Sequence, residues 1–250
     1  MISKNKIKFL RSLSLKKNRL KYKQVILEGY RLIEEAINAK VDIDYLVLTK
    51  KENKKIQQRK IFSGINLEII SNEDMKKISD IKNSQGILAL CNIDKYNNNI
   101  LENIKNENIV ILDGIQDFGN LGTIFRTCIW FGIKSVILTS NSIDPYNSKC
   151  IRSGMGAHFH LKNIIQQNTN KVLMYLNSKN YKIIVGDLDG ENIINLNIKG
   201  KWALILGSEA HGISQCFDQF KKVTIQKFGE IESLNVSTAC GILLNELTTN

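Results

Sequence analysis

Small polar and charged residues stand at three places where a predicted buried strand gives way to a loop or helix. They include an amide, a guanidinium and a carboxylate, which can orient a substrate or stabilise developing charge. The segments are Asp113 to Arg126, Leu204 to Gly212, and Ser233 to Ser237. A packed core does not require such side chains there, whereas α/β proteins build composite sites from loops at strand ends. The functional site is therefore expected in this half of the chain.

The first segment follows a predicted strand that ends at Leu112. Asn120 stands at the expected N-cap of a helix beginning near Leu121, and Arg126 lies about one and a half turns into that helix. Taken singly, each residue also fits an ordinary cap and a surface arginine. The nearby glycines form neither G-x-G-x-x-G nor a P-loop, which argues against a standard dinucleotide or nucleoside-triphosphate site.

The other two segments place a carboxylate and two capping residues at loops. Glu209 stands in a turn bounded by Gly207 and Gly212, where glycines allow close approach of a ligand to the backbone. This carboxylate could bind a hydroxyl, an amine or an arginine, or simply be solvated. Ser233 and Asn235 precede a helix that opens at Val236, and capping is their simplest role.

Together, these residues resemble the SpoU-type (TrmH-like) RNA 2′-O-ribose methyltransferases of the SPOUT superfamily. The matching motifs are Asn120 and Arg126 within DFGNLGTIFRT, Gly207, Glu209 and Gly212 in a G-x-E-x-x-G turn, and Ser233 to Ser237 reading S-L-N-V-S. Order, spacing and context agree over residues 109–247. Departures are mild: proline is usual at Phe118 and Gln226, asparagine at Ser208, and glycine at Ala210.

The resemblance implies an α/β catalytic domain with a deep C-terminal trefoil knot, a rare exception to ordinary chain topology. The knot would hold S-adenosylmethionine through backbone groups around Gly207, Ile225 and Leu234. The family is typically dimeric, so a homodimer through the knotted domain is expected, with both subunits contributing to each site. No metal is expected.

The resemblance also implies roles for the motif residues in a methyl transfer to a ribose 2′-hydroxyl. That hydroxyl is a poor nucleophile, so positioning contributes much of the barrier reduction. Arginine stays protonated in proteins, which favours phosphate binding and electrostatic orientation by Arg126 over a role as general base. Asn120 and Glu209 would orient Arg126, and Ser233 and Asn235 would hold the third loop and contact substrate or cofactor.

Basic residues concentrate in the first part of the chain. Residues 1–100 hold 21 Lys and Arg against 11 Asp and Glu, whereas residues 101–250 hold 14 against 13. The first 23 residues carry nine basic residues and no acidic one. This asymmetry indicates a polyanion-binding module joined to a nearly neutral catalytic one, and nucleic acid is the favoured polyanion. Lys, Asn and Ile are abundant throughout, so a merely solvated basic surface is the alternative.

Hydrophobic patterning predicts alternating strands and helices in both parts. The first part reads as a basic helix over 7–20, strands at 25–29, 45–48, 67–70 and 86–91, and helices over 30–39 and 72–78. The second part reads as strands at 109–112, 135–138, 182–185, 202–206 and 223–225, with helices over 121–131, 147–155, 171–180 and 236–247. Continuous apolar strands between helices indicate a parallel sheet covered on both faces.

These patterns, together with the family resemblance, predict three regions. Residues 1–95 form a basic α/β RNA substrate-binding domain, the polar, Asn-rich segment 96–107 is a linker, and residues 108–250 form the SpoU-type methyltransferase domain. We expect ribosomal RNA as substrate in preference to transfer RNA, because the two-domain layout resembles the ribosomal enzymes.

Composition limits the remaining possibilities. The five cysteines are odd in number and form no C-x-x-C pair, which fits the reducing cytoplasm rather than a disulfide framework or zinc site. His158 and His160 alternate in a predicted strand and are interpreted as ordinary polar side chains rather than a metal pair. The apolar runs are too short for a membrane span, and residues 1–15 lack a secretory pattern.

Three rival functions stay open at this point. The chain could bind RNA without catalysis, although the intact motif residues argue against this. It could methylate a base atom, although the S-L-N-V-S motif and the Asn/Arg pair favour ribose. It could also be a ribosome-assembly factor whose methylation is incidental.

Overall fold

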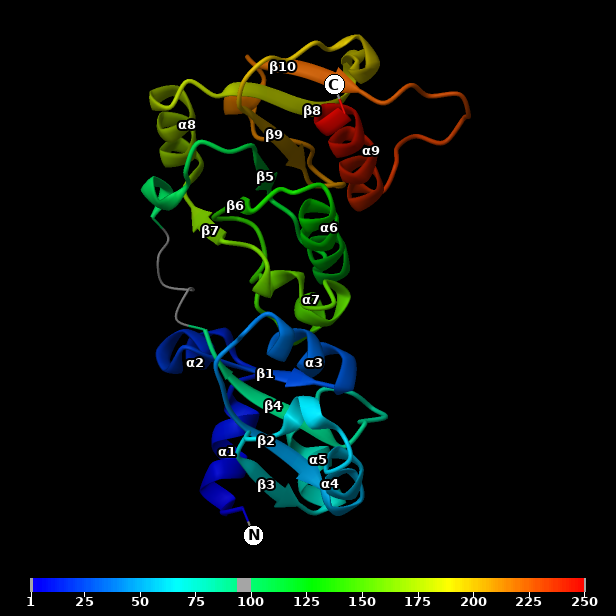
Figure 1. Ribbon diagram of the computed structural model, residues 1–250. Coiled ribbons are helices and arrows are strands. Elements are labelled where there is room, and N and C mark those ends of the chain that lie inside the picture. The colour runs from blue at the N-terminus through cyan, green and yellow to red at the C-terminus, as the bar shows by residue number, and fades with distance from the viewer. Residues whose placement is uncertain (1, 94–99, 250) are drawn as a thin grey trace. The chain divides into compact units, whose positions relative to one another are not determined.

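The computed structural model describes residues 2–93 and 100–249, and these fall into two compact units (Figure 1). Within the described residues, the first unit contains 2–93 together with 146–159, and the second contains 100–145 and 160–249. Of the predicted linker 96–107, residues 96–99 lie outside the described residues. Leu101 and Ile104 are buried in the core of the second unit, so that part of the segment is packed structure.

The first unit is a four-stranded mixed sheet in the order β1-β4-β2-β3, with helices packed on it. Only β2 and β3 are parallel. The elements are α1 (Lys4–Ser12), α2 (Lys16–Tyr22), β1 (Gln24–Glu28), α3 (Tyr30–Asn38), β2 (Ile43–Thr49), α4 (Lys50–Ile56), η1 (Lys60–Phe62), β3 (Leu67–Ile70), α5 (Asn72–Ile78) and β4 (Ile87–Asn92). Its core joins Leu10 and Leu13 to apolar side chains of β2, β4 and α5.

The predicted basic helix over 7–20 is wrong in one respect, because the segment forms two helices. α1 ends at Ser12, and the backbone turns before α2 begins at Lys16. The buried guanidinium of Arg19 donates from Nη1 to the carbonyl oxygens of Leu13 (2.7 Å) and Ser14 (2.6 Å). Carbonyls at the end of a helix need such partners, so Arg19 stabilises the break.

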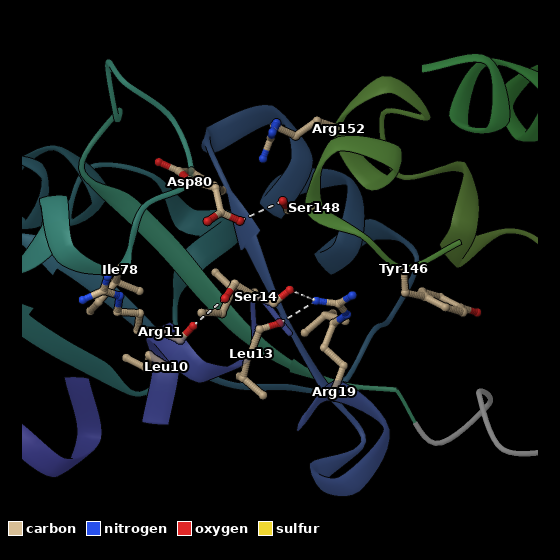
Figure 2. Close-up of a pocket in the computed structure, with 13 residues that line it drawn as sticks. Leu10, Arg11, Leu13, Ser14, Arg19, Ile78, Asp80, Tyr146, Ser148 and Arg152 are labelled. Atoms are coloured by element: carbon tan, nitrogen blue, oxygen red, sulfur yellow. Dashed lines mark hydrogen bonds between the residues drawn. The ribbon is translucent and has the colours of Figure 1, made fainter. Parts of the chain in front are cut away.

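Residues 146–159 belong to the first unit, although the sequence analysis places them in the C-terminal domain. The segment contains α7 (Ser148–Ser153) and η4 (Ala157–Phe159), and α7 packs against β1. Tyr146, Cys150 and Ile151 are buried there. The hydroxyl of Ser148 donates to Oδ2 of Asp80 at 2.8 Å (Figure 2). Burial of these apolar side chains, rather than position along the chain, assigns the segment to this unit.

The second unit is a six-stranded parallel sheet in the order β10-β8-β9-β5-β6-β7, confirming the predicted α/β class. Its elements are η3 (Leu101–Asn103), β5 (Ile109–Asp113), α6 (Phe118–Trp130), β6 (Ser135–Thr139), β7 (Asn163–Gln167), α8 (Thr169–Ser178), β8 (Lys182–Asn192), η5 (Ile193–Asn195), β9 (Trp202–Gly207), η6 (Gln215–Phe217), β10 (Lys221–Thr224) and α9 (Val236–Thr249). Every residue of β5 is buried, as expected for a central parallel strand.

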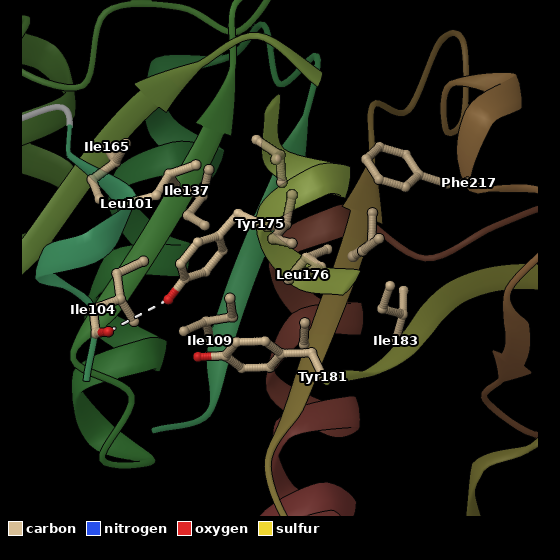
Figure 3. Close-up of a cluster of buried hydrophobic side chains, with 14 of the residues drawn as sticks. Leu101, Ile104, Ile109, Ile137, Ile165, Tyr175, Leu176, Tyr181, Ile183 and Phe217 are labelled. Carbon is tan, nitrogen blue, oxygen red and sulfur yellow. Dashed lines mark hydrogen bonds between the residues drawn. The ribbon is translucent and has the colours of Figure 1, made fainter. Parts of the chain in front are cut away.

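Helices cover both faces of this sheet. On one face, Tyr175 and Leu176 of α8 pack with Ile137, Ile183 and Phe217 in a continuous apolar cluster (Figure 3). On the other face, α6 and α9 pack against each other, and α9 contacts β9. The helix pair therefore lies beside the ends of β5 and β9, from which the predicted site loops leave.

Two glycines mark places where chain segments pass unusually close. A Cβ added at Gly190 would lie 2.4–2.5 Å from backbone atoms of Val223, and one added at Gly207 would lie 2.3 Å from the backbone of Gly212. Real Cβ atoms do not approach a backbone so closely, and the backbone cannot step aside as a flexible side chain can. Only glycine fits at either position.

The predicted strand through His158 and His160 is wrong. His158 lies in η4 and is buried in the first unit, where its Nε2 is 3.5 Å from Sγ of Cys150, and the next strand begins at Asn163. Among the residues described, no group of three or more His, Cys, Asp or Glu could hold a metal ion. Within the same residues, no helix is both long and apolar enough to cross a membrane.

Candidate active site

The loop after β5 brings Asn120 into the first turn of α6 rather than to its cap. The N-cap is Asp117, whose Oδ1 accepts the backbone N–H of Asn120 at 2.8 Å. The predicted capping role of Asn120 is therefore wrong. Because Asp117 satisfies the helix end, the side-chain amide of Asn120 is available to another partner.

A short closed turn after β9 presents Glu209. Ser208 and Gly212 exchange two backbone hydrogen bonds of 3.0 and 2.9 Å, and Oγ of Ser208 accepts the N–H of His211. The buried carboxylate of Asp113, at the end of β5, accepts the N–H of Ser214 at 2.6 Å. These bonds anchor both ends of the turn, so the exposed carboxylate of Glu209 projects from a defined backbone.

Three segments distant in sequence meet at the carboxylate of Glu209. Its Oε1 accepts Nδ2 of Asn120 at 3.1 Å, Nδ2 of Asn235 at 2.7 Å, and the N–H of Val236 at 3.2 Å. Asn235 also donates to Oδ1 of Asn120 at 3.0 Å. A carboxylate at the N-terminus of the 14-residue α9 interacts favourably with the helix dipole. We call Asn120, Glu209 and Asn235 the amide–carboxylate cluster.

Asn235 is fixed from its other side as well. Its Oδ1 accepts the N–H of Ser237 at 3.0 Å and the Ser237 hydroxyl at 2.5 Å. With its oxygen used this way, its Nδ2 faces Asn120 and Glu209. The S-L-N-V-S segment therefore both caps α9 and orients an amide of the cluster, where the sequence suggested capping alone as its simplest role.

Arg126 and Ser233 do not hydrogen-bond to this cluster. Arg126 is exposed on α6, and within the described residues its guanidinium has no hydrogen bond or ion pair with the protein. Ser233 is exposed in the loop before α9, and its hydroxyl has no partner within the same residues. An exposed guanidinium without such a partner is well suited to bind a phosphate.

A cavity of about 580 Å³ adjoins the cluster, a volume within the usual range of small-molecule sites. Gly207, Ile225 and Leu234, which the resemblance assigns to the cofactor, all line it, and so does Glu209. Apolar walls come from β8, from the end of β9, from β10 and from α9, at Leu188, Leu206, Val223, Val236 and Leu243.

These walls suit an adenosyl cofactor. Apolar side chains can enclose a purine, and the segment 225–235 has no helix or strand, so its backbone amides and carbonyls are not committed to a ladder. Leu188 was missed by the sequence analysis because β8 was expected to end at residue 185. Asp117 could have been found, since Asp before an apolar helical pattern is a recognised N-cap signal.

Comparisons with known proteins agree with this geometry. Residues 107–245 match the SpoU rRNA Methylase family, and residues 4–89 match the MRM3-like substrate binding domain. The 23S rRNA (guanosine(2553)-2′-O)-methyltransferase RlmP of Bacillus subtilis is 27% identical over 246 residues, covering 97% of this chain and 95% of that protein.

Two further relatives cover most of the chain. An uncharacterized tRNA/rRNA methyltransferase of Borreliella burgdorferi is 31% identical over 211 residues, covering 78% of this chain and 92% of its own length. The structure of a TrmH-family RNA methyltransferase candidate from Porphyromonas gingivalis superposes with a TM-score of 0.83 at 31% identity, covering 98% of both chains.

Proposed function

Because the chain belongs to the SpoU rRNA methylase family and is an RNA methyltransferase that uses S-adenosylmethionine, we propose that it methylates a ribose 2′-hydroxyl of ribosomal RNA. The observation that carries this proposal is the position of Glu209. Its carboxylate joins the cluster with Asn120 and Asn235, and the same residue lines the cofactor-sized cavity. Methyl donor and polar cluster would thus meet at one place.

Gly207, Ile225 and Leu234 would hold the adenosyl group through their backbone groups. When bound, S-adenosylmethionine supplies its methyl group as part of a sulfonium cation. The proposed trefoil knot would be formed by the segments around the cavity, which come from β8, β9, β10 and the start of α9. Gly207 and Gly212 line the cavity and expose backbone there without a side chain, which suits recognition by main-chain groups.

Arg126 would bind the phosphate beside the target ribose and orient the 2′-oxygen. The unpaired, exposed guanidinium supports this role, since arginine binds phosphate with two parallel hydrogen bonds. Asn120 and Glu209 would fix the groups around the acceptor, and Asn235 would hold the S-L-N-V-S loop with Ser233 towards substrate or cofactor. The guanidinium of Arg126 stays protonated and so cannot accept the 2′-hydroxyl proton, which would be lost late in the reaction or to water.

The other partners follow from charge and from family membership. The basic first unit would grip the RNA backbone away from the reacting ribose, as Lys and Arg do on phosphates. A homodimer through the second unit would complete each site. The five cysteines form no disulfide, which is consistent with a cytoplasmic reaction.

The decisive experiment supplies tritiated S-adenosylmethionine with unmodified ribosomal RNA or transfer RNA, using the wild-type protein and Arg126→Ala. We expect label in ribosomal RNA, recovered as a 2′-O-methyl nucleoside, and a loss of about 100-fold in the variant, because the phosphate contact that positions the 2′-oxygen is removed. Lys134→Ala is the matched control and should retain most activity, because Lys134 is exposed in the second unit just before β6, at the opposite ends of the parallel strands from the site loops.

Each rival predicts a different outcome. Label on a base atom would identify a base methyltransferase instead of a ribose methyltransferase. Label confined to transfer RNA would identify transfer RNA as the substrate. No label together with no cofactor binding would leave an RNA-binding protein without catalysis. An assembly factor would be indicated if Arg126→Ala lost methylation but still supported ribosome assembly in cells.

A further inference from the structure

The segment 225–235 forms one wall of the cofactor cavity yet has little packing of its own. It runs from the end of β10 to the start of α9 as a protruding loop, orange to red in Figure 1. Phe228 is 96% exposed and Ile231 is 67% exposed, although both line the cavity. Burial of these side chains therefore contributes little to holding the loop in place.

One side chain of this loop is tied to the rest of the unit. Oε1 of Gln226 accepts Nδ2 of Asn192 at 3.1 Å, and Nε2 of Gln226 donates to the carbonyl of Lys227 at 3.2 Å. Among the described residues, no other side chain of 225–234 makes a hydrogen bond or ion pair outside the loop. The next attachment along the chain is Asn235, in the amide–carboxylate cluster.

Asn192 is held in the orientation that this bond requires. It lies half-buried at the end of β8, where its Oδ1 accepts the N–H of Ile194 at 3.2 Å. The oxygen is thereby used, and Nδ2 faces Gln226. The two amides form a directed chain from Ile194 through Asn192 and Gln226 to Lys227, in which each side-chain oxygen accepts and each nitrogen donates.

We propose that Asn192 and Gln226 form a latch that holds the loop over the cofactor cavity, so that both are positioning residues for cofactor binding. The inference rests on the proposed function, since it assigns the loop to the cofactor site. Gln226 stands where proline is usual in the family that the sequence resembles. A proline would stiffen this position by fixing its backbone, whereas Gln226 secures it through a side-chain bond.

The first test measures the Kd of S-adenosylhomocysteine by calorimetry for single and double variants. Gln226→Ala and Asn192→Ala should each raise the Kd about 3- to 10-fold, the range for one neutral hydrogen bond. The double alanine variant should do no more, because both changes remove the same bond. Gln219→Ala removes an exposed amide whose one hydrogen bond within the described residues is to the Cys216 carbonyl, and it should leave the Kd unchanged.

Charge provides a second, independent comparison. Gln226→Glu keeps an acceptor for Asn192, and Asn192→Asp can accept from a flipped Gln226, but each change loses the bond to the Lys227 carbonyl, so each single variant should bind more weakly than wild type and more tightly than the matching alanine variant. The double variant N192D/Q226E places two carboxylates together, and it should weaken binding at least as much as Gln226→Ala. Retained binding in that double variant would overturn the latch.

Trypsin gives a readout that does not depend on cofactor. Lys227 is the single trypsin site between residues 223 and 249. Cleavage there should be several-fold faster in Gln226→Ala and Asn192→Ala than in wild type or Gln219→Ala, at unchanged Tm. Equal cleavage rates and equal Kd values would overturn the proposal. A wild-type protein that binds no cofactor would refute the proposed function instead, while the cleavage rates would still decide the latch.

Discussion

Glu209 shows how one side chain can serve stability and chemistry together. One of its carboxylate oxygens accepts hydrogen bonds from the first N–H of α9 and from the side-chain amides of Asn120 and Asn235, which we assign to the reaction. Substitutions in the amide–carboxylate cluster should therefore differ: some should affect activity alone, and others should also affect the stability of α9.

We predict that Glu209→Ala lowers the free energy of unfolding by about 1 kcal/mol, the usual cost of losing a helix cap, and lowers methyl transfer at least about 100-fold. Asn120→Ala should lower activity with little change in stability, because α6 is capped by Asp117. Activity assays and urea denaturation would check both. An Asn120→Ala variant as unstable as Glu209→Ala would contradict this separation.

A second carboxylate, that of Glu52, makes the stability of the first unit depend on pH. Glu52 is buried in α4, and its oxygens accept bonds from Oη of Tyr30 at 2.6 Å and Nζ of Lys55 at 2.7 Å. Burial alone would raise the pKa of Glu52, but these bonds outweigh it and lower the pKa below its usual value. Burial and the same Glu52 bond raise the pKa of Tyr30.

Because the folded pKa of Glu52 is the lower one, its stabilisation is present above the unfolded value of about 4.3 and is lost as pH falls through the folded pKa. Tyr30→Phe should therefore lower the free energy of unfolding by about 1–2 kcal/mol at pH 7 and by less at pH 3. Urea denaturation at both values would measure this. Tyr22→Phe is the matched control, since the Tyr22 hydroxyl makes no hydrogen bond within the described residues.

At the scale of elements, sequence patterning predicts much of the fold. The bounds of β3 and α5 agree with the structure, and the parallel β5, β6 and β9 follow from their apolar runs. β8 was expected to end at residue 185, because Asp187, Asp189 and Gly190 suggest a turn. In the structure the strand extends to Asn192. The register shift in its pairing with β10 accommodates them. Such pairing is non-local, so no short window of sequence can reveal it.

The candidate site could be located from sequence but not assembled from it. The motifs identify Asn120, Glu209 and Asn235, whereas the shared oxygen that joins them depends on three loops meeting in space. The cap at Asp117 was recoverable from local rules. The break between α1 and α2 was not, because it is stabilised by Arg19 reaching back six residues to Leu13.

The close passages predict which glycines the second unit requires. Gly190→Ala and Gly207→Ala would force a methyl group to within 2.5 Å of backbone, so we expect little folded protein. Gly229→Ala is the control, because nothing lies within 4 Å of its added Cβ. Expression level and circular dichroism would compare the three. Normal folding of Gly190→Ala would show that β8 and β10 can separate there.

At the scale of the whole molecule, the two units do not follow the linear division into residues 1–95 and 108–250. A protein of residues 108–250 alone would expose Tyr146, Cys150 and Ile151, which are buried in the first unit. We predict that it aggregates or binds a hydrophobic dye, as exposed apolar patches do. Co-expression with residues 1–95 should reverse this, as size-exclusion chromatography would show. A monodisperse, dye-free fragment would contradict the assignment.

The return of residues 146–159 to the first unit also has a consequence for biosynthesis. A nascent chain that has emerged only to residue 93 lacks α7 and cannot complete its first unit. At about 5–20 residues per second, translation takes several further seconds to supply residue 159, and by then β5, α6 and β6 have been made. The two units must therefore mature in overlapping intervals, which makes the timing of translation part of how this chain reaches its native state.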